Sequence, residues 1–230
     1  MNLFPVPDSE RRAALEAAEA RALQMFTAIE TAGLVRAGVS ERVVEDEIKA
    51  LALEKFGVTT HWHRRIVRSG PNSITTAGDH PPVRDIEAGD IVYLDLGPVF
   101  EGWEADIGKS YALGDDPRRN ALVAELPRQF DKVQRHFRGN PDITGAALYD
   151  FAVKSAEDAG WKFGGVIAGH IVSEFSHSQI PGPKDLTRIY PDNPEPMSRP
   201  DGNGRPRHWI GEIHLVELDG SFGGFYERLL

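Results

Sequence analysis

The sequence contains no cysteine, and it has no long apolar run. The first absence excludes disulfide bonds, zinc sites built on thiolates and a cysteine nucleophile. The second excludes a membrane span, which needs ~20 consecutive apolar residues. The N-terminal residues also lack the basic start and apolar core of a secretory signal peptide. We therefore expect a cytoplasmic protein with no membrane partner.

Positive charge is scarce as well. Lys and Arg number 26 against 35 Asp and Glu, which gives a formal net charge of −9 at pH 7. We expect no nucleic-acid partner, because a surface of this sign repels phosphate. The hydrophobic fraction of 40% and the charged fraction of 27% are ordinary for a globular protein, and 230 residues can bury a substantial core.

An unusual pair of acids lies in the stretch Ile91–Tyr111. Asp95 ends an apolar run that is typical of a buried strand, where an unpaired carboxylate is costly. Glycine and proline follow it, so we expect the chain to turn and a second strand near 104–113 to bring Asp106 beside Asp95. Two neighbouring carboxylates in a sheet need a cation, and Mn²⁺, Mg²⁺ or Fe²⁺ suits them. Taken alone, such a pair is more often made of strand-end caps or exposed hairpin residues.

Apolar periodicity predicts two helices before this stretch. The first is expected over 8–32, capped by Asp8 or Ser9, and the second over 41–55, capped by Ser40.

Two further helices are predicted after the central stretch. One starts at Asp116-Pro117 and runs to Arg138, with Pro127 kinking or dividing it, and the other opens at Thr144. Helices thus precede strands in both halves of the chain, which is compatible with a duplicated α+β unit.

Three histidines precede Asp95. Residues 58–68 suggest strands, and His61 and His63 would point to the same side of a strand. A His-x-His pair can bind metal, although surface or substrate-pocket imidazoles fit the pattern better. His80 falls in a polar, proline-containing loop.

The stretch 181–207 is rich in proline and poor in apolar residues. We interpret it as a loop insertion that forms a lid or a flap, because long loops in compact domains are usually functional or mobile.

The whole chain offers five candidate metal ligands, each in or beside a predicted strand: Asp95, Asp106, His170, Glu212 and Glu227. By alternation, Glu212 shares a strand face with His214, whereas its rival Glu217 falls on the opposite face. Four carboxylates and one imidazole would supply two divalent ions about 3.5–4 Å apart, with a bridging hydroxide as the nucleophile. Bound metal lowers the pKa of water toward neutrality.

The order and spacing of these residues resemble the pita-bread metallopeptidase family, which includes methionine aminopeptidase, Xaa-Pro aminopeptidase, prolidase and the metal-free relative creatinase. The resemblance rests on DLGPVFEGWEADIGKSY, on AGH with His177 seven residues later, on WIGEIHLVE and on GGFYE, and it extends from about Leu15 to the end. It implies an α+β pita-bread fold: a duplicated α+β unit with a curved antiparallel sheet covered by helices. It also implies that residues 1–230 form a single catalytic domain without the N-terminal domain of prolidases. Members of the fold often form dimers, so a homodimer is considered.

The resemblance also implies roles for individual residues. The family's Asp, Asp, His, Glu, Glu ligands match the five candidates, and they imply two divalent ions, with manganese expected and cobalt, iron or zinc as alternatives. His177 matches the family's second histidine, which contacts substrate or stabilises the tetrahedral intermediate. A further histidine of several members is matched by His80, with His61 or His63 as substitutes. Glu212 is expected to carry a proton to the leaving nitrogen.

Three positions depart from the family's pattern. Ile171 follows His170 where glycine is usual, Gly108 stands where threonine is usual, and Ile213 replaces the proline after Glu212. These differences concern the identity of the substrate more than metal binding.

The sequence therefore predicts a metal-dependent, aminopeptidase-like hydrolase that cleaves a small peptide or amide. Two alternatives stay open: a non-catalytic peptide- or protein-binding module of the same fold, and a metal-free hydrolase like creatinase.

Overall fold

The computed structural model describes residues 6–230. Its helices are α1 (Asp8–Thr31), α2 (Glu41–Phe56), α3 (Pro117–Gly139) and α4 (Gly145–Asp158), with short 3-10 helices η1 (Gly70–Ile74), η2 (His177–Gln179) and η3 (Lys184–Thr187). Its strands are β1 (Ile66–Ser69), β2 (Ile91–Leu96), β3 (Val99–Phe100), β4 (Trp103–Glu104), β5 (Ile107–Ala112), β6 (Lys162–Phe163), β7 (Ile171–Val172), β8 (His208–Val216) and β9 (Gly223–Leu229).

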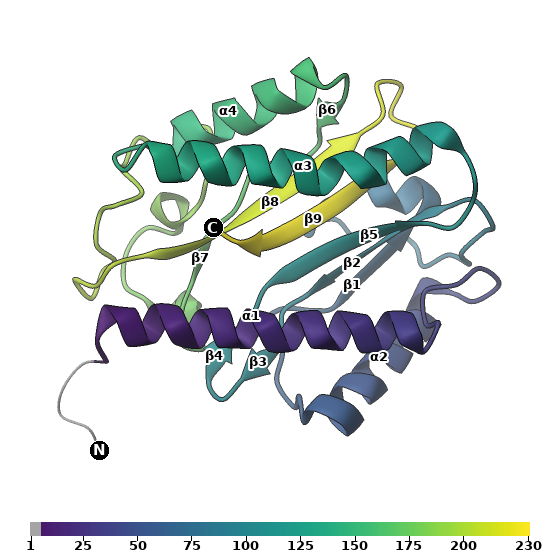
Figure 1. Ribbon diagram of the computed structural model, residues 1–230, viewed down its shortest axis with the longest axis horizontal. Coiled ribbons are helices and arrows are strands. Elements are labelled where there is room, and N and C mark those ends of the chain that lie inside the picture. Colours follow the sequence, from purple (N-terminus) through teal and green to yellow (C-terminus); the bar gives the residue numbers. More distant parts are fainter. Residues whose placement is uncertain (1–5) are drawn as a thin grey trace.

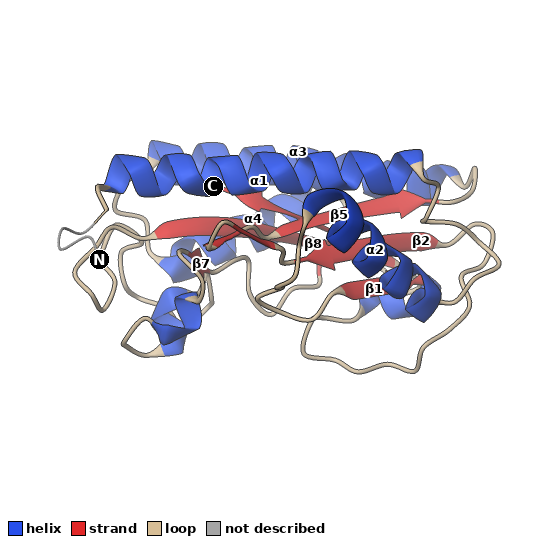
Figure 2. Cartoon of the chain, turned by 90° about the horizontal axis from the view of Figure 1, so that it is seen from below, coloured by secondary structure: helices blue, strands red, loops and turns tan. Residues whose placement is uncertain are grey.

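A curved antiparallel sheet runs through the molecule, and α1 and α3 lie over one of its faces (Figures 1 and 2). The strand order is β1-β2-β5-β9-β8-β6, with β7 paired to β8. The hairpin β2–β5 belongs to the first half of the chain and the hairpin β8–β9 to the second. The two hairpins join where Gly108 of β5 pairs with Glu227 of β9. Each half thus contributes two helices followed by a hairpin, which confirms the predicted duplicated α+β unit.

Side-chain caps fix three of the four helix starts. The Ser40 hydroxyl accepts the Val43 N–H before α2, Asp116 accepts two N–H groups before α3, and Thr144 accepts the Ala147 N–H before α4. These three starts were predicted from the sequence.

The predicted cap of the first helix was wrong, and so was the division at Pro127, which had been predicted as the alternative to a kink. Helix α1 has no side-chain cap: Pro7 occupies the cap position, and Asp8 is already helical. Helix α3 is not divided at Pro127. Its apolar face packs on β8 and β9 with Leu122, Leu126 and Phe130 buried, and this burial outweighs the ~3 kcal/mol that an internal proline costs.

Two apolar clusters fill the space between helices and sheet. One joins α1 and α2 to β1 and β2, and the other joins α3 and α4 to β8. In β2, the side chains of Val92, Leu94 and Leu96 belong to the first cluster. Tyr93 and Asp95 alternate with them and line a cavity on the other side. The core therefore fixes the strand whose alternate residues form the site.

Of the strands predicted within 58–68, the structure forms only the end, which belongs to β1, and residues 58–65 are irregular. Only His61 makes an isolated bridge, to Pro98, and the Trp62 N–H donates to the Gly97 carbonyl at 2.9 Å. His61 and His63 therefore do not lie on one strand face. The segment is instead attached to the turn that follows β2.

The proline-rich stretch 181–207 contains η3 and otherwise irregular backbone. Two of its apolar side chains, Ile189 and Met197, are buried in the second cluster. Within the described residues, no helix is long and apolar enough to cross a membrane.

Candidate metal centre

A cavity of about 420 Å³ lies against the sheet face that carries Asp95. All five predicted ligands line it: Asp95, Asp106, His170, Glu212 and Glu227. Asp95, Glu212 and Glu227 lie in β2, β8 and β9. Asp106 directly precedes β5, and His170 directly precedes β7. The structure therefore brings together side chains that are up to 132 positions apart (227 − 95) in the sequence.

Strand register places the acids. Glu212 and Glu227 are direct cross-strand partners in the β8–β9 hairpin, and Asp95 pairs with Gly108 in the β2–β5 hairpin. Gly108 is also opposite Glu227 at the junction of the hairpins. A Cβ atom on Gly108 would lie 2.5 Å from the Phe225 ring and 3.1 Å from the Glu227 Cβ. The absence of a side chain at Gly108 therefore allows β9 to bring its carboxylate to the aspartates.

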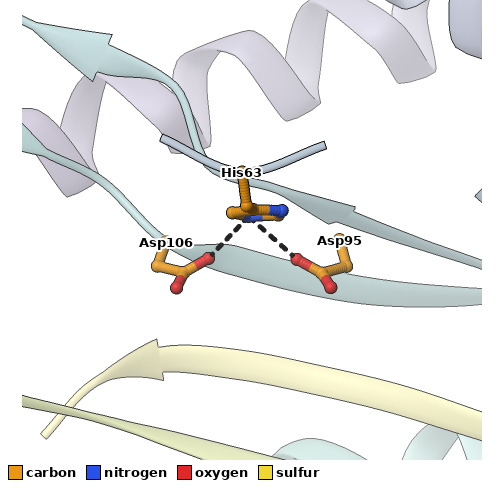
Figure 3. Close-up of side chains that lie close together, drawn as sticks. All are labelled: His63, Asp95 and Asp106. Atoms are coloured by element: carbon orange, nitrogen blue, oxygen red, sulfur yellow. Dashed lines mark hydrogen bonds and ion pairs between the residues drawn. The ribbon is translucent and has the colours of Figure 1, made fainter. Parts of the chain in front are cut away.

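Two histidines face the aspartates. His63 Nε2 lies 3.3 Å from Asp95 Oδ1 and 3.3 Å from Asp106 Oδ1 (Figure 3). His170 Nε2 lies 3.1 Å from the other oxygen of Asp106 and 3.8 Å from Glu212 Oε1. Asp106 thus lies between two imidazoles, one on each carboxylate oxygen.

Burial and charge shift the pKa values of these groups in opposite directions. Burial would raise the pKa of Asp106, but His170 and His63 outweigh it and hold that pKa at about 2. For Asp95, burial prevails over His63 and raises the pKa to about 6. Burial raises the pKa of Glu212 to about 8 and that of Glu227 well above its ordinary value, with the neighbouring carboxylates adding to both.

The same interactions raise the pKa of both imidazoles. Burial would lower the pKa of His63, but Asp95 and Asp106 raise it to about 9. Burial is likewise overcome at His170, where Asp106 and Glu212 raise the pKa to about 9. The carboxylates therefore stabilise the protonated, positively charged form of both imidazoles.

The donor set fits divalent cations. Ligand atoms of His63, Asp95 and Asp106 lie within 4.8 Å of one another, as do those of Asp106, His170 and Glu227. The His170 approach to Asp106 Oδ2 lacks hydrogen-bond geometry, and this buried oxygen has no hydrogen-bond partner within residues 6–230. Buried carboxylates without sufficient donors are stabilised by coordination to a cation.

His177 is held by an acid that sequence reasoning missed. Its ring Nδ1 lies 2.9 Å from Glu104 Oε2, and its backbone N–H donates to Glu104 Oε1 at 2.9 Å. Glu104 is 1% exposed and also accepts the Ser173 N–H. The sequence signal was present: a second acid two residues before Asp106, in a short strand, is as unexpected as Asp95.

Trp62 fills the space between the histidines. The centroid of its ring lies 5.1 Å from that of His170 and 4.9 Å from that of His177, and the two imidazoles are 5.3 Å apart in a stacked arrangement. Trp62 lines the cavity, whereas His177 is not among the described residues that line it. The sequence had given no role to Trp62.

The structure does not bring His80 or His61 to the aspartates. His80 is exposed and is not among the described residues that line the cavity, whereas His63 lies beside the aspartates. Burial lowers the pKa of His61 to about 4, with positive neighbours adding to the effect. Glu217, the rival of Glu212, points away and pairs with Arg118 at 2.5 Å.

His214 shares the cavity face with Glu212, as alternation along the strand predicted. Its Nε2 is 2.9 Å from the Ser73 carbonyl oxygen, which can only accept. The ring is therefore fixed by a hydrogen bond to η1.

Comparison with known proteins agrees with this architecture. The model of metallopeptidase family M24 matches residues 13–197. The Xaa-Pro dipeptidase of Lactobacillus delbrueckii subsp. lactis is 29% identical over 130 residues, which are 55% of this chain and 34% of that protein. The Xaa-Pro dipeptidase of Lactobacillus helveticus is 25% identical over 129 residues. The chain thus spans about a third of the length of these curated relatives.

Solved structures share the fold. A prolidase from Thermococcus sibiricus matches with a TM-score of 0.71 and 21% identity, over 98% of this chain and 57% of that one. A methionine aminopeptidase from Rickettsia prowazekii matches with a TM-score of 0.71 and 14% identity, over 99% of this chain and 95% of that one. The family match covers most of the chain, and the pita-bread architecture agrees with it. This chain belongs to metallopeptidase family M24.

Proposed function

We propose that this chain is a metal-dependent peptidase that binds two divalent ions and hydrolyses small peptides, with Xaa-Pro dipeptides as the substrate class to test first. The observation that carries the proposal is the convergence of five ligand-type side chains on one cavity: Asp95, Asp106, His170, Glu212 and Glu227. Asp106 belongs to both groups of close ligand atoms, so it would be shared between the ions. Manganese is the expected metal, because carboxylates dominate the set.

Bound divalent ions would supply a nucleophile from water at neutral pH and would polarise the scissile carbonyl. Glu212 would move the proton. Its carboxylate lines the cavity beside the other ligand-type side chains, so it would accept a proton from the attacking water and deliver it to the leaving nitrogen.

His177 would hydrogen-bond to the scissile group. The Glu104 carboxylate accepts the Nδ1–H of His177, which fixes the ring and leaves Nε2 as the atom that meets substrate. The backbone N–H of His177 also donates to Glu104, so ring and backbone are held by the same carboxylate. A preoriented donor of this kind is worth several kcal/mol in the transition state of acyl transfer.

The cavity suits a short substrate. Its volume of about 420 Å³ lies in the range of small-molecule sites. Apolar walls come from Ile66, Tyr93 and Phe225, and two arginines, Arg64 and Arg188, line the cavity as well. A dipeptide would place its side chains on the walls and its terminal carboxylate near an arginine. The two Lactobacillus relatives are Xaa-Pro dipeptidases, which supports the same substrate class.

Elemental analysis of purified protein, combined with hydrolysis of an Xaa-Pro dipeptide panel in added Mn²⁺, tests the proposal. The wild type should contain about two ions per chain and turn over at least one dipeptide. Asp106→Ala should lose both ions and lower kcat/KM about 1,000-fold or more, since several kcal/mol of metal catalysis disappear. Asp131→Ala, at an exposed position of α3, is the matched control and should behave as the wild type.

Two results would contradict the proposal. Wild-type protein that binds no metal after Mn²⁺ loading would reject the dinuclear mechanism and favour a binding module. Metal without turnover of any short peptide would retain the centre and reject the substrate class.

A further inference from the structure

His63 and His170 are held in the same way, although they come from different parts of the chain. His63 Nδ1 lies 2.6 Å from the carbonyl oxygen of Arg64, and His170 Nδ1 lies 2.7 Å from that of Ile171. In both cases the partner is the carbonyl of the next residue. A carbonyl oxygen can only accept, so Nδ1 carries the hydrogen in both rings. Metal-binding histidines are typically fixed through this second nitrogen.

The fixed tautomer gives the other nitrogen a definite role. With the hydrogen on Nδ1, the neutral ring of His63 directs the Nε2 lone pair at Asp95 Oδ1 and Asp106 Oδ1, each 3.3 Å away. In the metal-free protein a second ring hydrogen fills this place, and Nε2 donates it to Asp106 Oδ1 at 3.3 Å. Without that proton, the lone pair and the two carboxylate oxygens repel one another unless a cation lies between them. A divalent ion meets this need, because it accepts the imidazole lone pair and both carboxylates at once.

The distances agree with shared coordination. Ligand atoms at about 2.0–2.1 Å from a tetrahedral ion lie about 3.3 Å from one another. The His63 nitrogen has this separation from both aspartate oxygens. The ring is only 18% exposed, and it forms a close group with the two aspartates in the same way that His170 does with Asp106 and Glu227.

The backbone around His63 fixes its position. The Trp62 N–H donates to the Gly97 carbonyl, and His61 bridges to Pro98, so the segment is attached to the turn directly after Asp95. A Cβ on Gly97 would lie 2.3 Å from the His63 ring. The missing side chain at Gly97 therefore leaves room for an imidazole beside the aspartates.

We propose that His63 is a sixth protein ligand, which binds the ion held by Asp95 and Asp106. The inference rests on the proposed dinuclear function and departs from the five-residue set that the family resemblance implies, which has one histidine. Imidazole suits zinc, cobalt, iron and nickel, whereas carboxylates suit manganese and magnesium. His63 would thus shift the preference of the ion at Asp95 away from manganese.

The test compares wild type, His63→Ala and His61→Ala as metal-free proteins, each titrated with Co²⁺ and with Mn²⁺. Cobalt binding is followed by visible absorption and manganese binding by electron paramagnetic resonance, so neither readout depends on activity. His61 lies two residues away and outside both groups of close ligand atoms, which makes His61→Ala the matched control. Thermal melting confirms that each variant folds.

We expect two Co²⁺ sites in the wild type and in His61→Ala. In His63→Ala, one site should weaken about tenfold or more while the other is retained, and the loss should be larger for Co²⁺ than for Mn²⁺. In Zn²⁺-loaded protein, imidazole ¹⁵N resonances should show two metal-bound Nε2 atoms in the wild type and one in His63→Ala.

Other results separate this inference from the proposed function. Two ions bound with wild-type affinity by His63→Ala would overturn the ligand role and leave the dinuclear proposal intact. Loss of dipeptide hydrolysis with unchanged metal affinity would also overturn it and assign His63 to the substrate. A wild type that binds no ion would reject both proposals.

Discussion

The two hairpins deliver acids to one cavity under opposite electrostatic conditions. The β2–β5 hairpin brings Asp95 and Asp106, which face two imidazoles, and the pKa of Asp106 stays at about 2. The β8–β9 hairpin brings Glu212 and Glu227, where burial prevails and raises both pKa values. Similar topology thus places an ionised carboxylate on one side and proton-holding carboxyls on the other. The difference follows from the imidazoles, which lie 3.1 and 3.3 Å from the Asp106 oxygens, whereas His170 is 3.8 Å from Glu212.

The largest effect is expected when one acid in each hairpin is replaced by its neutral amide. The free energy of unfolding of the metal-free protein is then measured. Asp106→Asn should lower the free energy of unfolding by about 3 kcal/mol, because it removes the charged carboxylate that two buried imidazoles share. Glu227→Gln should be neutral or raise it by about 1 kcal/mol, because it removes a buried carboxyl that lacks a cationic partner. Urea unfolding at pH 7 measures both. Equal destabilisation by the two changes would show that the hairpins do not differ in this way.

The junction of the hairpins is tested at Gly108. In Gly108→Thr, the new side chain meets the Phe225 ring at a position where a Cβ would be only 2.5 Å away. Such overpacking should cost about 1–3 kcal/mol and displace Glu227 from the aspartates. Thermal melting and metal content report these two effects. Ser110→Thr, on the same strand, is the control for adding a methyl group in β5. Normal stability and full metal content in Gly108→Thr would show that the close approach is not required.

The pH dependence of metal-free stability follows from the raised pKa values. The histidines have folded pKa values of about 9 against 6.5 in the unfolded chain, so their stabilisation is complete below pH 6.5 and is lost as the pH rises through 9. Glu212 has a folded pKa of about 8 against 4.5, so it too loses stability as the pH rises from 4.5 to 8. Both terms lower the stability of metal-free protein between pH 5 and pH 9.

Divalent ions should reverse that trend, because they replace the protons. The stabilisation that Mn²⁺ provides should therefore grow from pH 6 to pH 9. Thermal melting with and without Mn²⁺ across this range tests the prediction. Metal-free stability that rises with pH would contradict the raised pKa values of the imidazoles and of Glu212.

The smallest expected effect concerns Glu104, which supports the site without joining the close ligand groups. Glu104→Gln should lower kcat about tenfold, because the His177 ring loses the carboxylate that orients it. Metal content and KM should change little. The Glu104→Asp variant, which retains the charge on a shorter side chain, should recover part of the loss. A loss of bound metal in Glu104→Gln would instead assign this acid to the metal centre.

The sequence by itself determined the local elements and identified the five ligand-type residues that line the cavity. Helix starts at Ser40, Asp116 and Thr144 depend on a side chain and an N–H two or three residues away, so a short window contains the interaction. The face shared by Glu212 and His214 follows from alternation within one strand, which is equally local. Order and spacing then marked the acids as one cluster in a known family.

The tertiary structure decided the features that depend on contacts between distant segments. It selected His63 over His80, because the Trp62 N–H reaches the Gly97 carbonyl and attaches an irregular segment to the turn after β2. It placed Glu104 under His177, 73 positions away. It also preserved α3 across Pro127, because burial against the second hairpin exceeds the local cost of proline. In each case the deciding free energy comes from packing between remote parts of the chain, which no local pattern in the sequence records.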